Sequence, residues 1–308
     1  GNGISTGISP PVPVTVVPAL SAIAAGYAHT CAADLIGAVS YWGKNYYGQL
    51  GDGTYAYRLD PGAVPAASPA QALGSAYSST CAVLADGTAR CWGDGGEGQL
   101  GHGGPVDSLV PKRVSGPEGF QDVSPGWMFS CGLTLTGEVR CWGKGELGEL
   151  GDGGSERQAV PVAVALPAPA VALSSAWNHS CVRLDTGAVY CWGWNYQGQL
   201  GNGAHWINDV PVEVLALPPA REVSAGARHT CAVDVGGQAY CWGENTYGQV
   251  GDGTTQNQDL PAPVVGIDDA DPGRDGMAPR VTQQRPVADR QWQLLGQLES
   301  GEAGAERP

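Results

Sequence analysis

The sequence predicts an all-β protein, a β-propeller built from four-stranded blades. Three observations support this fold class. With 48 glycines, 23 prolines and only 15% charged residues, the composition favours many short strands joined by tight turns. One pattern recurs every fifty residues without insertion or deletion, and four-stranded units of about this length are typical of propeller blades. A hydrophobic content of 42% is sufficient for a packed core.

Several columns of identical residues carry the fifty-residue period. A cysteine and a Trp-Gly step occur once per period, together with glycine and proline columns in the same register. Agreement in so many columns excludes chance, and a fixed period fixes the architecture. The columns are Cys31, Cys81, Cys131, Cys181 and Cys231; Trp42, Trp92, Trp142, Trp192 and Trp242; Gly37, Gly87, Gly137, Gly187 and Gly237; Gly48, Gly98, Gly148, Gly198 and Gly248; and Pro11, Pro61, Pro111, Pro161, Pro211 and Pro261.

One unit, residues 71–114, illustrates the strands expected in every blade. Three short strands precede a long loop, and a fourth strand follows the loop. The fourth strand begins with Pro111, which has no N–H for a ladder bond, so this strand is predicted at the outer edge of its sheet. In chain order the predicted strands cover residues 72–76, 80–84, 88–92 and 111–114.

The turn between the second and third strands sets their register. Ala85-Asp86-Gly87 fits a three-residue hairpin loop with Gly87 in the left-handed conformation, which glycine adopts without steric cost. This loop pairs Leu84 with Thr88. Counting outward, it places Cys81 opposite Cys91.

Three short motifs recur in the blades. A G-x-x-H-[ST] step is found at residues 26–30, a Trp-Gly step at residues 42–43, and a G-Q-L-G-[DN]-G turn at residues 48–53, with counterparts up to Gly253. This pattern resembles the RCC1 repeat, in its secreted or cell-surface bacterial form with a Cys-Trp-Gly step. Kelch repeats have a similar period, but they carry a paired glycine in a strand and lack this turn. The resemblance covers residues 1–266 and implies a propeller.

Five complete blades are expected within a propeller domain at residues 1–266. The segment 11–14 is left over as an outer strand, because the fifth blade has its own at 261–265. The family closes its ring with seven blades, so the chain is either a segment of a larger ring or a smaller ring closed in an unusual way. Residues 267–308 carry none of the blade columns and are predicted to be a disordered acidic and polar tail. The expected blades cover residues 20–65, 70–115, 120–165, 170–215 and 220–265.

The nine cysteines form four pairs at C-x9-C spacing, while Cys31 lies opposite Tyr41. Disulfides are favoured over reduced thiols because the two cysteines of the C-x9-C pair occur together in four of the five blades. Each bridge closes an eleven-residue loop, with a stabilisation of about 2.5 to 3 kcal/mol. Metal binding is disfavoured because each blade offers only two ligands. Disulfides indicate an extracellular, cell-surface or periplasmic protein. The predicted pairs are Cys81 with Cys91, Cys131 with Cys141, Cys181 with Cys191, and Cys231 with Cys241.

Composition and motifs argue against several classes of function. A net charge of −14 should repel nucleic acids and anionic membranes, and no apolar run approaches the ~20 residues of a membrane span. The histidine position beside the repeated cysteine holds Ser79 and Phe129 in two blades, so it is not expected to supply a catalytic base. No phosphate-binding or nucleophile motif occurs. The chain is therefore predicted to be no enzyme and to bind no cofactor or metal.

One variable aromatic column follows the first strand of each blade and is predicted to cluster at one mouth of the propeller. It resembles a region of a plant photoreceptor of the family, but the arginine needed there occurs only at Arg228, so photoreception is not expected. Aromatic residues and arginine anchor many protein interfaces. The candidate partner-binding residues are Tyr27, Tyr77, Trp127, Met128, Trp177 and Arg228. A second candidate patch in the long loops comprises Tyr46, Tyr47, Trp194, Tyr196, Trp206 and Tyr247.

The leading hypothesis is a non-catalytic extracellular scaffold that binds a protein partner. Nucleotide exchange on a small GTPase, the activity of the founding family member, is the alternative; the acidic charge and the paired cysteines disfavour it. A third hypothesis is an accessory domain of a larger cell-surface protein or a secreted enzyme inhibitor, since the resemblance includes an inhibitor of that kind.

Overall fold

The computed structural model describes residues 19–116 and 119–266, which form five four-stranded antiparallel sheets. We call these sheets blades 1 to 5 in chain order. The strands are β1 (Leu20–Ala25), β2 (His29–Asp34), β3 (Val39–Gly43), β4 (Arg58–Ala63), β5 (Ala70–Ser75), β6 (Ser79–Leu84), β7 (Ala89–Gly93), β8 (Ser108–Arg113), β9 (Phe120–Pro125), β10 (Phe129–Thr134), β11 (Val139–Gly143), β12 (Gln158–Val164), β13 (Ala170–Ser175), β14 (His179–Leu184), β15 (Val189–Gly193), β16 (Asn208–Glu213), β17 (Ala220–Ala225), β18 (His229–Asp234), β19 (Ala239–Gly243) and β20 (Gln258–Pro263), and a short 3-10 helix covers Pro65–Ala67.

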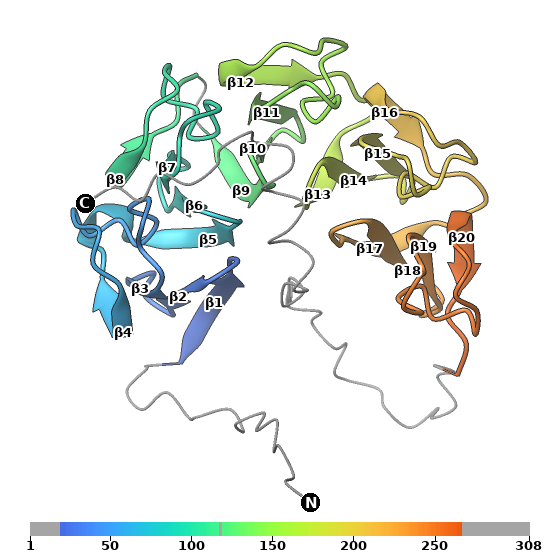
Figure 1. Ribbon diagram of the computed structural model, residues 1–308, viewed down its shortest axis with the longest axis horizontal. Coiled ribbons are helices and arrows are strands. Elements are labelled where there is room, and N and C mark those ends of the chain that lie inside the picture. Colours follow the sequence, from blue (N-terminus) through green and yellow to red (C-terminus); the bar gives the residue numbers. More distant parts are fainter. Residues whose placement is uncertain (1–18, 117–118, 267–308) are drawn as a thin grey trace, which may run out of the picture.

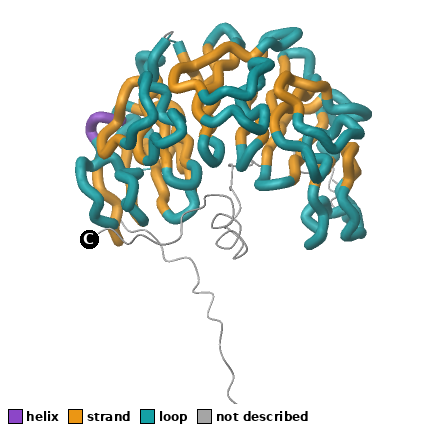
Figure 2. The backbone as a smooth tube through the Cα atoms, turned by 45° about the horizontal axis from the view of Figure 1, so that its top comes forward, coloured by secondary structure: helices purple, strands orange, loops and turns teal. Residues whose placement is uncertain are grey.

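The blades stand side by side in an arc, with the first strand of each blade on the inside and the fourth strand at the rim (Figure 1). The predicted all-β propeller architecture is therefore confirmed, including the proline-bearing strand at the outer edge. The arc is open between β1 and β17 in both views, so the described residues do not form a small closed ring (Figures 1 and 2). The leftover strand at 11–14 and the tail at 267–308 lie outside the described residues.

The hairpin in blade 2 has the register that its turn predicts. Gly87 is left-handed, with φ of 80°, and the Leu84 N–H donates to the Thr88 carbonyl at 2.9 Å. The predicted outer strand, by contrast, begins three residues too late: β8 starts at Ser108, because this residue pairs with Gly93 across a register shift in the ladder. The first strand likewise begins at Ala70 rather than at residue 72.

Four cystines join the second and third strands of blades 2 to 5, as predicted, with paired Cα atoms 4.0 to 4.1 Å apart. In blade 1 the same position pairs Cys31 with Tyr41, and both side chains are fully buried. The cystines are Cys81–Cys91, Cys131–Cys141, Cys181–Cys191 and Cys231–Cys241.

The repeated tryptophan joins each blade to the one before it. Trp142 is completely buried, packs against Phe120, and donates its indole N–H to the Gln99 carbonyl at 2.8 Å. Trp92, Trp192 and Trp242 make the equivalent bond at the other three blade junctions. The blades are thus held by a repeated contact that combines apolar burial with a satisfied indole donor.

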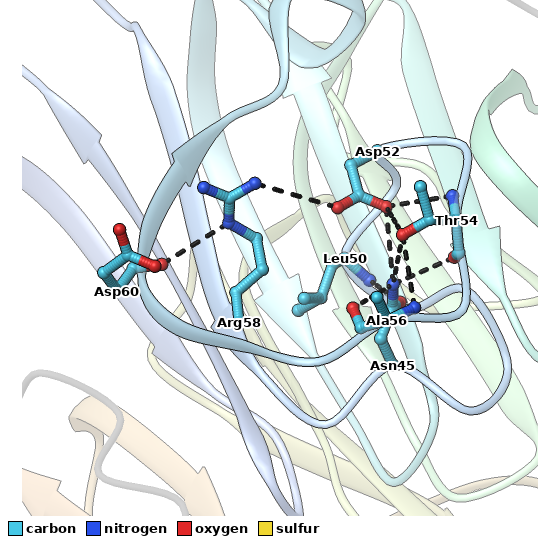
Figure 3. Close-up of polar contacts among 7 residues, drawn as sticks. All are labelled: Asn45, Leu50, Asp52, Thr54, Ala56, Arg58 and Asp60. Atoms are coloured by element: carbon cyan, nitrogen blue, oxygen red, sulfur yellow. Dashed lines mark hydrogen bonds and ion pairs between the residues drawn. The ribbon is translucent and has the colours of Figure 1, made fainter.

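The long loop before each outer strand is held by its own polar side chains. In blade 1, Asn45 is fully buried, donates from Nδ2 to the carbonyls of Thr54 and Ala56 at 2.9 and 3.0 Å, and accepts the Leu50 N–H at 2.9 Å (Figure 3). Asp52 accepts the Thr54 N–H and hydroxyl at 3.0 and 2.8 Å. These bonds satisfy the backbone of a loop without regular structure and fix what it presents.

Candidate functional site

The predicted aromatic column forms a continuous row of rings along the inside of the arc. The ring centroids lie 4.7 Å apart for Tyr27 and Tyr77, 6.4 Å for Tyr77 and Trp127, and 5.6 Å for Trp127 and Trp177. Each side chain comes from the turn between the first two strands of its blade, so the fifty-residue repeat places the four on one face. All four are half-buried.

The row continues into a loop that the sequence analysis assigned to a separate patch. Trp194 lies 6.0 Å from Trp177, and Tyr196 lies 5.8 Å from Trp194. Trp194 and Tyr196 therefore belong with the aromatic row, which we define as Tyr27, Tyr77, Trp127, Trp177, Trp194 and Tyr196. The other members of the second patch, Tyr46, Tyr47, Trp206 and Tyr247, are exposed on their loops.

Two cations lie over the rings of the row. The Arg228 guanidinium is 4.7 Å from the centroid of Trp177 and 5.3 Å from that of Trp194. The Lys144 ammonium is 5.6 Å from Trp127. Glu244 approaches Arg228 to 3.8 Å, so this cation is shared between a carboxylate and two aromatic faces.

The register of the hairpin explains which residues join the row. Extending the pairing of Cys131 with Cys141 outward brings Met128 opposite Lys144, and the Lys144 N–H donates to the Met128 carbonyl at 2.9 Å. Arg228 is joined in the same way to Glu244, at 2.8 Å. The sequence pattern did not single out Lys144 and Glu244, and it placed Trp194 in the separate loop patch, although the predicted register of the hairpin contained the signal for all three. Met128 itself is half-buried.

An apolar recess of about 100 Å³ opens beside the aromatic row at the centre of the arc. Its walls are formed by rings of the row and by small residues of several blades, so no bulky side chain fills it. Burial and the neighbouring Tyr27 raise the pKa of Tyr77, which remains an uncharged hydroxyl donor at neutral pH. An apolar recess with a hydroxyl donor at its rim suits the binding of an apolar side chain from a partner. The small residues are Ala25, Ser75, Ala76, Ala176 and Ala225.

The buried histidines are structural. Thr80 donates its hydroxyl to the Gln49 carbonyl and accepts the Nε2–H of His29 at 2.8 Å. His179 makes the same contact with Thr230 at 2.9 Å. Burial lowers the pKa of His29 to about 4 and that of His179 to about 3. Both side chains are therefore uncharged at neutral pH, and their hydrogen bonds connect neighbouring blades.

The described part of the chain contains no group of three or more His, Cys, Asp and Glu residues arranged to hold a metal ion. Within the same residues, no helix is long and apolar enough to cross a membrane.

Comparison with solved structures shows RCC1-type propeller neighbours. Human WBSCR16 has a TM-score of 0.73 at 20% identity, covering 82% of this chain and 68% of that chain. Prp20p of Saccharomyces cerevisiae, in a structure described with its binding to Gsp1p and histones, has a TM-score of 0.58 at 20% identity, covering 80% and 77%. Yeast RCC1 (Prp20) bound to Kap60 gives 0.57 at 20% identity, covering 80% and 75%. These likenesses establish the fold. No curated protein matches the chain.

Two family models, both described as the regulator of chromosome condensation (RCC1) repeat, match the chain. The first matches residues 86–133, 136–183, 186–233 and 236–274, and the second matches residues 21–49, 170–199 and 220–249. The first match, 86–133, runs from β7 to β10 and so joins the outer half of one blade to the inner half of the next. With more than half of its length matched by the repeat, the chain belongs to the RCC1 repeat family.

Proposed function

We propose that this chain is a non-catalytic scaffold that binds a protein partner through the aromatic row. The observation that carries the proposal is the contact chain from Tyr27 to Tyr196, with Arg228 over its rings and an apolar recess beside it. Tyrosine, tryptophan and arginine dominate the energetics of protein interfaces. The yeast neighbours are described as binding Gsp1p, histones and Kap60, all of them proteins, which supports a binding role for this kind of propeller.

The cystines support a location outside the reducing cytosol. Four cross-strand bridges in one chain are typical of secreted, cell-surface or periplasmic proteins. We therefore place the partner among proteins of that compartment, and we assign the chain to the secreted or cell-surface bacterial type of the family.

Affinity capture with matched variants tests the proposed face. The purified, oxidised chain would be immobilised, and any captured protein would be purified and titrated against the wild-type chain and the Trp127→Ala and Leu135→Ala variants. Leu135 is the control because it is 70% exposed at the hairpin tip, at the opposite end of β10 from Trp127. Loss of a central aromatic anchor should weaken binding by about 2 kcal/mol, or roughly thirtyfold.

Two outcomes would contradict the proposal. A partner that binds the Trp127→Ala variant as well as the wild type uses another face. Acceleration of nucleotide release from a purified small GTPase would favour the exchange activity of the founding family member instead.

A further inference from the structure

Among the described residues, the outer half of one face of blade 1 is not covered by another part of the chain. Trp42 of blade 1 is only half-buried, whereas Trp92 and Trp142 in the same position are completely buried. Leu59 in β4 is 97% exposed, while its counterpart Leu109 is half-buried. Blade 1 therefore has an uncovered surface where the other blades are covered.

The covering segment is the same at every other blade junction. On blade 2 it is residues 51–68: a Cβ added to Gly51 would lie 2.6 Å from the Trp92 indole nitrogen, so the glycine backbone rests on the ring. Val64 packs into the same cluster as Trp92. The Gly53 N–H donates to the Leu109 carbonyl at 2.9 Å.

The same three contacts recur at the next three junctions. The glycine on the ring is Gly101 at Trp142, Gly151 at Trp192 and Gly201 at Trp242; the valine is Val114, Val164 and Val214; and the backbone bond runs from Gly103 to Ala159, from Gly153 to Asp209 and from Gly203 to Asp259, each at 2.9 Å.

Residues 1–18 carry the sequence of this covering segment. Gly1, Gly3, Pro11 and Val14 stand fifty residues before Gly51, Gly53, Pro61 and Val64, and the same four columns hold in every later repeat. Val14 precedes Leu20 by six residues, as Val64 precedes Ala70. The segment 1–18 contains no Asp, Glu, Lys or Arg, so no side-chain charge has to be desolvated when it packs on an apolar surface.

We propose that residues 1–18 dock on the open outer half of blade 1 as residues 51–68 dock on blade 2. In this arrangement the segment covers Trp42 and Leu59, as the segment 51–68 covers Trp92 and Leu109. The inner half of the face has Leu20 and Ile23 42% and 50% exposed. The segment 1–18 is not expected to cover it, because the equivalent Phe120 and Val123 of blade 3 are covered by the inner strands of blade 2.

The counterpart loops show that such a segment can close on itself. Ser115 donates its N–H to the Gly101 carbonyl at 2.8 Å, and Leu215 donates to Gly201 at 3.0 Å. Thr15 and Gly1 occupy these two positions in the segment 1–18. Unlike Pro65 in the segment 51–68, Thr15 has a backbone N–H at this position.

Hydroxyl-radical footprinting of the full chain, read by mass spectrometry at single residues, tests the proposal. Val14→Lys places a charge against Trp42 and should raise oxidation of Trp42 and Leu59 severalfold. Val12→Lys is the matched control, because blade 2 already has the exposed Lys112 in that column, and it should leave both residues protected. Trp142 should remain protected throughout and thereby report an intact fold.

Deletion of residues 1–18 provides a second, independent variant and should reproduce the effect of Val14→Lys at Trp42 and Leu59, with oxidation of Ile23 unchanged. Equal oxidation of Trp42 in the wild type, the Val14→Lys variant and the deletion would overturn the proposal. Protection of Trp42 that grows with protein concentration would also overturn it, by assigning the face to a second copy of the chain.

Discussion

Blade 1 and blade 4 fill the same cross-strand position in two different ways. In blade 4, Cys181 and Cys191 are joined in a cystine with Cα atoms 4.1 Å apart. In blade 1, Cys31 faces Tyr41, whose ring lies edge-on to Trp92 at 5.3 Å. Both positions are fully buried and face the following blade.

The difference shows that this position must be filled, and that a covalent bond is one way to fill it. A cystine stabilises mainly by restricting the unfolded chain. The tyrosine ring stabilises by apolar burial and by its contact with the next blade. The two solutions should therefore respond differently to truncation, to pH and to reductant.

Truncation of the tyrosine should have the largest effect. Tyr41→Ala removes a completely buried ring from the junction with blade 2 and should lower the free energy of unfolding by about 3–5 kcal/mol. Denaturant unfolding of the oxidised chain measures the change. Tyr55→Ala is the control, since this ring is 59% exposed, and a loss as large as that of Tyr41→Ala would show that the buried ring is not the cause.

The buried histidines should make the blade junctions sensitive to acid. Their pKa values fall from 6.5 to about 4 for His29 and about 3 for His179. Below about pH 6.5 the unfolded state binds protons that the folded state excludes, so the free energy of unfolding decreases as the pH falls from 6.5 towards 4. The shift of His29 corresponds to about 3 kcal/mol.

Unfolding measured across this pH range, with the His29→Ser and His179→Ser double variant beside the wild type, tests that slope. Serine is the residue that blade 2 carries at this position, Ser79. The double variant should lose the part of the slope that His29 and His179 contribute, while His229, whose pKa is also lowered by burial, keeps its share. An unchanged slope would assign the acid sensitivity to other groups.

Removal of one cystine should cost slightly less than removal of the tyrosine ring. The Cys181→Ala and Cys191→Ala double variant opens an eleven-residue loop and should lose about 2.5 to 3 kcal/mol. Adding reductant to the double variant should then destabilise it less than it destabilises the wild type, because one bridge is already absent. Equal losses on reduction would mean that this bridge contributes nothing.

Blade 3 differs from the others in a buried carboxyl group, and changing it should have the smallest of these effects. Glu149 is fully buried where the other blades have glutamine, and burial raises its pKa from 4.5 to about 7. The Glu149 carboxyl loses its proton at a lower pH in the unfolded state than in the folded state. The free energy of unfolding therefore falls as the pH rises from about 4.5 to 7. Glu149→Gln should therefore stabilise the chain by about 2–3 kcal/mol at pH 8.

The same substitution should have little effect at pH 4.5, where the glutamate is protonated in the folded state. Thermal unfolding at the two pH values distinguishes this titration from simple repacking. Stabilisation of equal size at both pH values would contradict the assignment to the charge of Glu149.

Much of the fold follows from the sequence because the repeat is exact in length. The fifty-residue columns and the hairpin at Gly87 give the strands, their register and the four cystines. The bounds of the outer strands do not follow as well. β8 begins at Ser108 because of a register shift at Gly93, and the glycine of the Trp-Gly step, with φ of 97°, marks the place of this shift but not its size. The open arc depends on contacts between blades that no single repeat contains.

The candidate site could be predicted only in part. The turn after the first strand carries most of the aromatic row, and the repeat alone places those residues together. Lys144 and Trp194 come from the loops after the third strands of blades 3 and 4, and they reach the row through the outward continuation of each hairpin. The contact of Arg228 with both Trp177 and Trp194 depends on side-chain positions across two blades, which a pattern in the sequence does not specify.

A count of thiols tests the central claim, a disulfide-bonded propeller scaffold from an oxidising compartment, most directly. The purified chain would be unfolded without reductant, alkylated and weighed as an intact protein. The oxidised chain should contain one alkylated cysteine, Cys31, and four bridges. Nine alkylated cysteines would contradict it and would direct the search for a partner to the reducing cytosol.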